Sequence, residues 1–197
     1  MKKLTKALAF LGVFVLAGCS STPVKQYYQL PVVAAAADSS SEQTSFRSTG
    51  SDNRHPQLWI QRITLGDVLG NAGIVYQTSD VEYNIGSTNL WAGPLEQQLL
   101  EVMTTELSQA LPDRLVSVQP LESKPDTLTV TVTGFHGRYD GKVIVAGSWI
   151  YTHGDAVIRH PFNLVLEQAE NGYPALVRTL GQGWAQVSKS VADELRK

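Results

Sequence analysis

The chain has 197 residues, of which 43% are hydrophobic and 17% charged, and its 16 basic residues nearly balance 18 acidic ones for a formal charge of -2. No run of basic residues is longer than two, so the sequence lacks the basic stripe that binding to a nucleic-acid backbone needs. The apolar fraction is enough for a packed core, and the length is that of one domain. A single cysteine, Cys19, excludes an intrachain disulfide and a cysteine-based zinc cluster.

The first 18 residues are typical of a secretory signal peptide. Three lysines precede an apolar run of 11 residues from Ala7 to Ala17. A helix rises about 1.5 Å per residue and needs about 20 residues to cross a bilayer, so this run is too short to span one. We therefore expect residues 1–18 to be cleaved off. Loss of the three lysines leaves 13 basic against 18 acidic residues, a mildly acidic mature chain.

The end of the signal explains the single cysteine. Leu16-Ala17-Gly18-Cys19 resembles the lipobox of bacterial lipoproteins at every position. The resemblance implies that Cys19 becomes the new N-terminus and carries an S-diacylglycerol and an N-acyl chain such as palmitate. Ser20 stands where an aspartate is associated with retention in the inner membrane, which indicates the outer membrane. Several acyl chains anchor a protein stably. An inner-membrane anchor and a plain secreted protein are the alternatives.

Two segments of contrasting composition follow the anchor. Residues 19–26 form a short polar tether, and Tyr27 to Pro31 suits a short strand, stopped by proline, that docks onto the domain. From Val32 to Pro56 large apolar residues are almost absent, which predicts a flexible excursion at 32–56. We expect this excursion to be exposed to solvent; the alternative is a loop that becomes ordered on a partner.

Hydrophobic periodicity in the rest of the chain predicts strands and two helices. Strict alternation is typical of strands with one buried face, and it is clearest from Thr127 to Thr133. Apolar residues three and four apart indicate helices, and prolines suit the first turn of the first helix and its end. In chain order we expect strands at 57–63, 74–77 and 81–85, a helix that starts within Asn89–Pro94 and ends before Pro112, strands at 114–118, 127–133, 142–152 and 162–167, and a helix from Tyr173 to Leu195. We expect Ile74 to Ile85 to form a hairpin around Ser79-Asp80, and the strands at 127–133, 142–152 and 162–167 to form an antiparallel meander.

These elements define the expected fold class. Two helices with one apolar stripe each, and a sheet with one apolar face, satisfy each other's burial when they pack in two layers. We therefore expect an α+β two-layer sandwich, with a mostly antiparallel sheet and two amphipathic helices packed on one face. No internal repeat and no second linker is present, so residues 27–197 should form a single domain.

The sequence offers no constellation for catalysis or for a metal, so we expect no enzyme, no metal and no cofactor besides the lipid at Cys19. No two of the four histidines, at positions 55, 136, 153 and 160, are four residues apart. Ser148 lacks the glycine that a nucleophile elbow requires two residues later. Asp140 and Asp155 can be proposed as a carboxylate pair, but both lie in turns, where aspartate bonds locally. The tryptophans suit the core: Trp59, Trp91, Trp149 and Trp184.

Four strings in the mature chain resemble the lipoprotein auxiliary components of ABC-type intermembrane transport systems. They extend across the whole predicted domain, and only the excursion at 32–56 offers nothing to compare. The strings are Tyr27-Tyr28-Gln29-Leu30-Pro31, Gly73 to Val81, Asn89-Leu90-Trp91-Ala92, and Gly137 to Val145.

The resemblance implies a subunit without enzymatic activity that is anchored in the outer membrane and faces the periplasm. It would dock with an MCE-domain protein that reaches from the inner membrane, help to move lipids or other hydrophobic molecules, and maintain envelope integrity. MCE proteins form rings, so the resemblance also admits a homo-oligomer, which the sequence itself does not show. Tyr27, Tyr28 and Trp91 match the family pattern and are weak candidates for partner binding, with packing as the alternative.

Two other functions remain open from the sequence. One is a solitary lipid-binding lipoprotein that carries cargo in its own cavity. The other is a peptidoglycan-associated envelope lipoprotein, or an enzyme that acts on glycans through Asp140 and Asp155.

Overall fold

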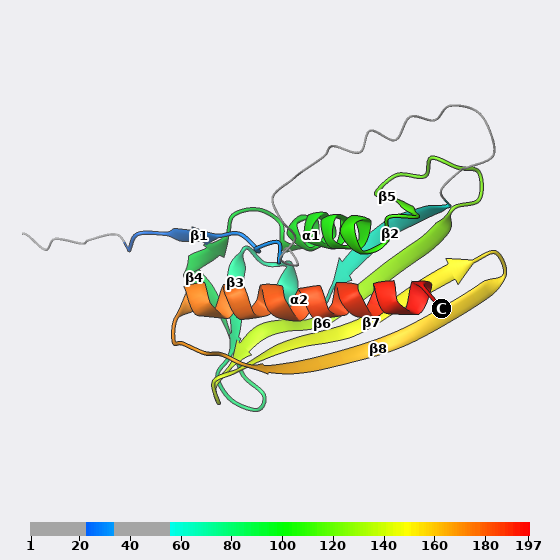
Figure 1. Cartoon of the computed structure of the whole chain (residues 1–197). Coiled ribbons are helices and arrows are strands. Elements are labelled where there is room, and N and C mark those ends of the chain that lie inside the picture. The colour runs from blue at the N-terminus through cyan, green and yellow to red at the C-terminus, as the bar shows by residue number, and fades with distance from the viewer. Residues whose placement is uncertain (1–22, 34–55) are drawn as a thin grey trace, which may run out of the picture.

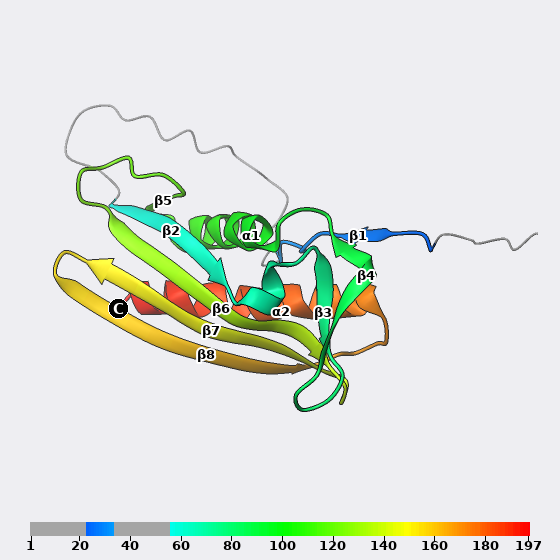
Figure 2. The same ribbon diagram turned by 180° about the vertical axis from the view of Figure 1, so that it is seen from behind.

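The structure is a computed structural model that describes residues 23–33 and 56–197. Within these residues, one eight-stranded sheet is covered on one face by two helices, α1 (Leu95–Ala110) and α2 (Tyr173–Leu195). Figure 1 views the molecule from the helix side, and Figure 2 shows the sheet from behind. The expected α+β class, with both helices on one face, is confirmed. The signal peptide, Cys19 and nearly all of the excursion lie outside the described residues, so those predictions are not tested.

One long strand, β6, organises the sheet. Its first half pairs in parallel with β2 and its last residues pair in parallel with β3, while its other side carries the antiparallel meander of β6, β7 and β8. Strand β4 extends the sheet beyond β3; the outermost strands are β1 next to β4, β5 next to β2, and β8 next to β7. The strands are β1 (Gln26–Tyr28), β2 (Gln57–Leu65), β3 (Gly73–Gln77), β4 (Tyr83–Trp91), β5 (Leu115–Ser117), β6 (Asp126–Arg138), β7 (Lys142–His153) and β8 (Ala156–Glu167).

The alternating pattern of β6 creates the core. Leu128, Val130 and Val132 are buried under the helices, whereas the threonines between them lie on the opposite, uncovered face. A bulge after Val132 interrupts the alternation, and Phe135 then continues the buried row. An amphipathic sheet of this kind needs a second apolar layer, which the stripes of α1 and α2 supply.

Trp184 of α2 lies where both helices and the sheet meet. Its side chain is fully buried, and its indole N–H donates a hydrogen bond of 3.0 Å to the Leu99 carbonyl of α1. Its ring meets the rings of Phe135 and Phe162 edge-on, with centroids 6.3 and 6.5 Å apart. Aromatic residues in this arrangement contribute large apolar areas together with favourable ring contacts.

Four boundaries differ from the sequence-based expectation. Strand β6 continues past Thr133 to Arg138, because it resumes pairing with β7 after the bulge. Residues 89–91 do not start the first helix but end β4, because β1 pairs with them along the edge of the sheet. The helix begins only after Gly93-Pro94, at Leu95. Strand β8 begins at Ala156 rather than at Phe162, because its first half is an exposed edge that needs no alternating pattern. The expected hairpin of β3 and β4, the meander and the C-terminal helix are confirmed.

We expect Trp184→Ala to lower the free energy of unfolding by about 3–5 kcal/mol, because it removes a fully buried aromatic side chain from the layer interface. Trp184→Phe keeps most of the apolar area and removes the bond to Leu99, so it should cost clearly less. Urea denaturation followed by circular dichroism measures both. Equal losses in the two variants would contradict this role for the indole ring.

Candidate functional site

The described residues nearest the predicted lipid form an arm, residues 23–33, that is bound along the domain. Its strand β1 lies in parallel register with the end of β4, with Tyr28 opposite Trp91. The Tyr28 carbonyl accepts a hydrogen bond of 2.7 Å from the Ala92 backbone N–H, which continues the pairing beyond the strand. The arm therefore begins as an edge strand of the sheet, at the end of the molecule opposite the β7–β8 turn (Figure 1).

Beyond β1 the arm crosses to the helices. Leu30 is buried, and its backbone N–H donates a hydrogen bond of 2.8 Å to the side-chain carbonyl of Gln98 on α1. The Gln98 amide in turn donates to the Gly93 carbonyl at 3.1 Å, which fixes its orientation. Pro31 lies directly over Gly181 of α2, where a Cβ atom would come within 2.8 Å of the proline ring. The arm is therefore held by the sheet and by both helices.

The structure brings the three candidate partner-binding residues together through the pairing of β1 with β4. Trp91 is buried and packs against Phe135, with ring centroids 6.1 Å apart. Tyr28 is half-buried, lies beside the ring of Tyr173, and donates a hydrogen bond to the Asn89 side chain. Tyr27 is 63% exposed. Packing accounts for Trp91 and Tyr28, so Tyr27 is the one of the three whose side chain is open to a partner.

A buried polar pair lies where the described part of the arm ends. The Glu106 side chain of α1 is 9% exposed, and neither of its oxygens has a hydrogen-bond partner among the described residues; the same holds for the buried Ser188 hydroxyl of α2. Burial, which disfavours the charged form, raises the pKa of Glu106. A carboxyl with a raised folded-state pKa favours folding less as the pH rises and it ionises.

We expect Glu106→Gln to raise the free energy of unfolding at neutral pH by about 1–3 kcal/mol, because the amide has the same shape but cannot ionise and so avoids the desolvation of a buried charge. The wild type should lose stability as the pH rises from about 4.5, and the variant should not show this loss. Thermal denaturation at several pH values from 4 to 8 measures both. A parallel pH dependence in the two proteins would contradict the assignment to Glu106.

A second buried carboxylate joins three elements at the other end of the sheet. Asp126, at the start of β6, accepts hydrogen bonds of 2.6 Å from Arg114 and from the hydroxyl of Tyr151 on one oxygen. Its other oxygen is 2.6 Å from Nδ1 of His153. Burial alone would raise the pKa of Asp126, but the hydrogen bonds from Tyr151, Arg114 and His153 outweigh it and lower this pKa. Every partner is engaged with Asp126, so the cluster is a structural tie between β6, β7 and the loop after α1.

Asp126→Asn should destabilise the fold by about 3 kcal/mol at neutral pH, because it leaves Arg114 without its buried counter-ion. The sign with pH follows from the lowered pKa: the stabilisation is present above the ordinary value near 4 and is lost as the pH falls through the folded-state pKa. Chemical denaturation at pH 7 and pH 3 measures the difference between variant and wild type. A difference that did not shrink at pH 3 would contradict this origin.

The proposed carboxylate pair for glycan hydrolysis is wrong, because Asp140 and Asp155 are too far apart to act together. Asp140 precedes β7 and Asp155 follows it, so all 12 residues of an extended strand separate them. Such a strand is about 40 Å long, whereas paired glycosidase carboxylates lie about 5–10 Å apart. Arg138 binds both oxygens of Asp140, at 2.8 and 2.7 Å, and lowers its pKa to about 2. Asp140 therefore stabilises the turn.

The other chemistry-bearing residues are also accounted for by their surroundings. His136 is buried beside Tyr83, and burial lowers the pKa of its imidazole. His160 lies flat on the Trp149 indole, with ring centroids 5.2 Å apart. In residues 23–33 and 56–197, no group of three or more histidine, cysteine, aspartate or glutamate side chains is placed to hold a metal ion. No helix in the same ranges is both long and apolar enough to cross a membrane.

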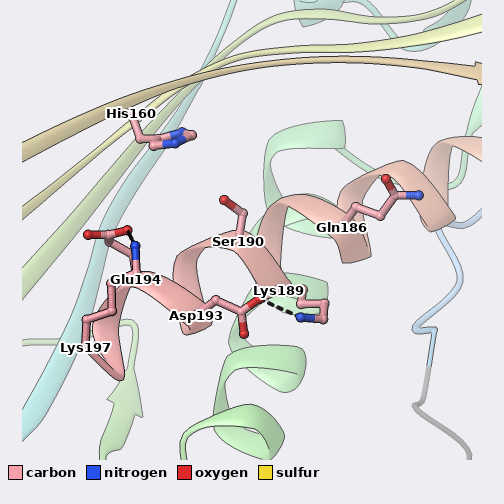
Figure 3. A pocket seen from close by; sticks show the side chains of 7 residues that line it. All are labelled: His160, Gln186, Lys189, Ser190, Asp193, Glu194 and Lys197. Carbon is pink, nitrogen blue, oxygen red and sulfur yellow. Dashed lines mark hydrogen bonds and ion pairs between the residues drawn. The ribbon is translucent and has the colours of Figure 1, made fainter.

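One surface was not anticipated from the sequence. A groove of about 430 Å³ separates His160 on β8 from the polar side chains of the last three turns of α2 (Figure 3). It depends on how far α2 lies from the edge of the sheet, which no local pattern encodes. The signal available in the sequence was Pro161, because a proline inside a strand is typical of a sheet edge.

Residues 28–192 match the family of ABC-type transport auxiliary lipoprotein components, which covers the arm from Tyr28, the whole sheet beyond it and both helices. The chain belongs to this family. It is also similar to the intermembrane transport lipoprotein PqiC of Escherichia coli K12, with 45% identity over 193 residues and 98% of each chain covered. The PqiC of Shigella flexneri matches equally well.

Two solved structures share the fold. A crystal structure of an uncharacterized protein, 43% identical, covers 88% of this chain and 99% of its own with a TM-score of 0.75. A protein from Xanthomonas campestris, 15% identical, covers 69% of this chain and 81% of its own with a TM-score of 0.61. At that identity the second similarity shows the fold alone. Together the comparisons confirm a PqiC-like lipoprotein.

Proposed function

We propose that this chain is an outer-membrane lipoprotein subunit of an intermembrane transport system, without enzymatic activity, that docks from the periplasmic side with an MCE-domain protein. The curated relatives are named intermembrane transport lipoproteins, which supports a transport role. The lipid at Cys19, the outer membrane and the MCE partner are parts of the proposal. A homo-oligomer is compatible with it.

The observation that carries the proposal is the bound arm. Only the tether separates Cys19 from β1 at Gln26, and a chain spans at most about 3.6 Å per residue, so the lipid lies within about 25 Å of the sheet. From Gln26 to Pro31 the arm is fixed to β4, α1 and α2. A domain fixed in this way stays close to its own membrane. It can therefore take part in transport between two membranes only if a partner reaches across to it.

Cys19→Ala should abolish metabolic labelling with palmitate and move the protein from the outer-membrane fraction to the soluble periplasm, because no acyl chains remain to hold it. Ser20→Asp is the matched control, since it should keep the lipid and shift the protein to the inner membrane. Density-gradient fractionation of labelled cells measures both. Retention of the Cys19→Ala form in the outer membrane would contradict the anchor.

The partner is tested by affinity purification of the full lipidated chain from mildly solubilised membranes. We expect an MCE-domain protein to co-purify with it. Recovery of the folded lipoprotein without any MCE-domain protein would contradict the docking role.

A further inference from the structure

The edge of the sheet at β8 has two properties that together indicate a binding site for an extended peptide. Strand β8 is 12 residues long, and within the described residues it pairs only with β7. Every residue of β8 has a partner on β7, so the ladder on its inner side is complete. The outer side is therefore a long row of backbone groups available to another strand.

The position of Pro161 shows which residues direct their backbone groups outward. Pro161 lies opposite Ser148 within the ladder, and a proline is tolerated in a strand where the missing N–H would point away from the neighbouring strand. Backbone groups alternate between the two sides of a strand. Arg159 and Asn163 therefore also face outward, one on each side of Pro161, and both are exposed.

The groove beside β8 supplies the second property. His160, stacked on Trp149, forms its strand side, and Gln186 and Ser190 of α2 are among the residues opposite (Figure 3). The charged residues there are paired within the helix, Lys189 with Asp193 and Lys197 with Glu194. An edge strand that runs beside a helix, with a groove between them, is suited to strand addition: the backbone pairs with the edge, and alternate side chains enter the groove. The paired charges favour uncharged polar side chains.

We propose that β8 binds an extended, uncharged polar segment of the MCE-domain partner, which adds to the sheet as a further strand. This inference rests on the proposed function. A second copy of this chain is a poorer occupant, because its other sheet edges are short. Strands β1 and β5 have three residues each, and the unpaired outer stretches of β2 and β4 beside them, residues 60–65 and 83–88, have six each. Pairing of β8 with another β8 would bring together two strands that both lack the outward donor at Pro161. When a segment of the partner pairs with β8, the missing N–H of Pro161 occurs only once in the new ladder.

The test compares Asn163→Pro with Asn163→Ala in the full lipidated chain. Proline removes one outward N–H beside the existing gap and leaves the ladder to β7 intact, whereas alanine changes the side chain and keeps that donor. We expect Asn163→Pro to reduce the MCE-domain protein recovered by affinity purification at least tenfold, and Asn163→Ala to recover wild-type amounts. Unchanged recovery with Asn163→Pro would overturn the edge proposal and leave the docking role standing. Failure of the wild type to recover the partner would overturn the docking role itself.

A second measurement does not depend on how the proline variant folds. A benzophenone amino acid replaces Arg159 on the outer edge, or, as the control, the exposed Arg62 at the bulge of β2. Irradiated cells should give adducts with the MCE-domain protein from position 159 and not from position 62. Adducts between two copies of this chain from position 159, or partner adducts of equal yield from both positions, would overturn the proposal.

Discussion

The fold depends on one constraint, the pairing of β6 along its full length. This strand of 13 residues pairs with β2 at its beginning, with β3 at its end and with β7 throughout on the other side. The alternation of buried and exposed side chains along β6 determines which face of the sheet the helices cover. Strands β2 and β3 pair with the same side of β6, and the bulge after Val132 lies between their two paired stretches. The arm is joined to β6 through β4 and β3, and the β8 edge is joined to it through β7, so β6 positions both.

The arm and the β8 edge lie at separate places on the domain. The arm is bound at the β1–β4 end, next to the predicted lipid, and the β8 edge extends from that end toward the β7–β8 turn (Figure 2). A strand added to β8 would therefore lie along the length of the domain and leave the arm free to stay at the membrane. The predicted anchor and the proposed partner-binding edge therefore do not compete for the same residues.

Sequence reasoning recovered those features that local patterns encode. The period of two in Thr127–Thr133 and the helical spacing in α2 reflect burial on one face, so the meander and the C-terminal helix followed directly. The lipobox predicts lipid attachment at Cys19 from four consecutive residues; Cys19 lies outside the described residues, so this stays a prediction. The end of β4 was mistaken for a helix start because its strand character depends on β1, more than 60 residues earlier. The Leu30–Gln98 bond joins residues 68 positions apart, and the groove beside β8 lies between His160 and residues from Gln186 onward, so no local pattern reports either contact.

The central claim is that a lipid-anchored domain meets an MCE-domain partner at its own membrane. The most direct measurement is photo-crosslinking in intact cells, with reactive residues placed across the folded surface of the wild type and of the Cys19→Ala form. The account predicts adducts with the MCE-domain protein that cluster on one face and fall sharply without Cys19. Partner adducts that are independent of Cys19, or adducts only with peptidoglycan, would contradict it.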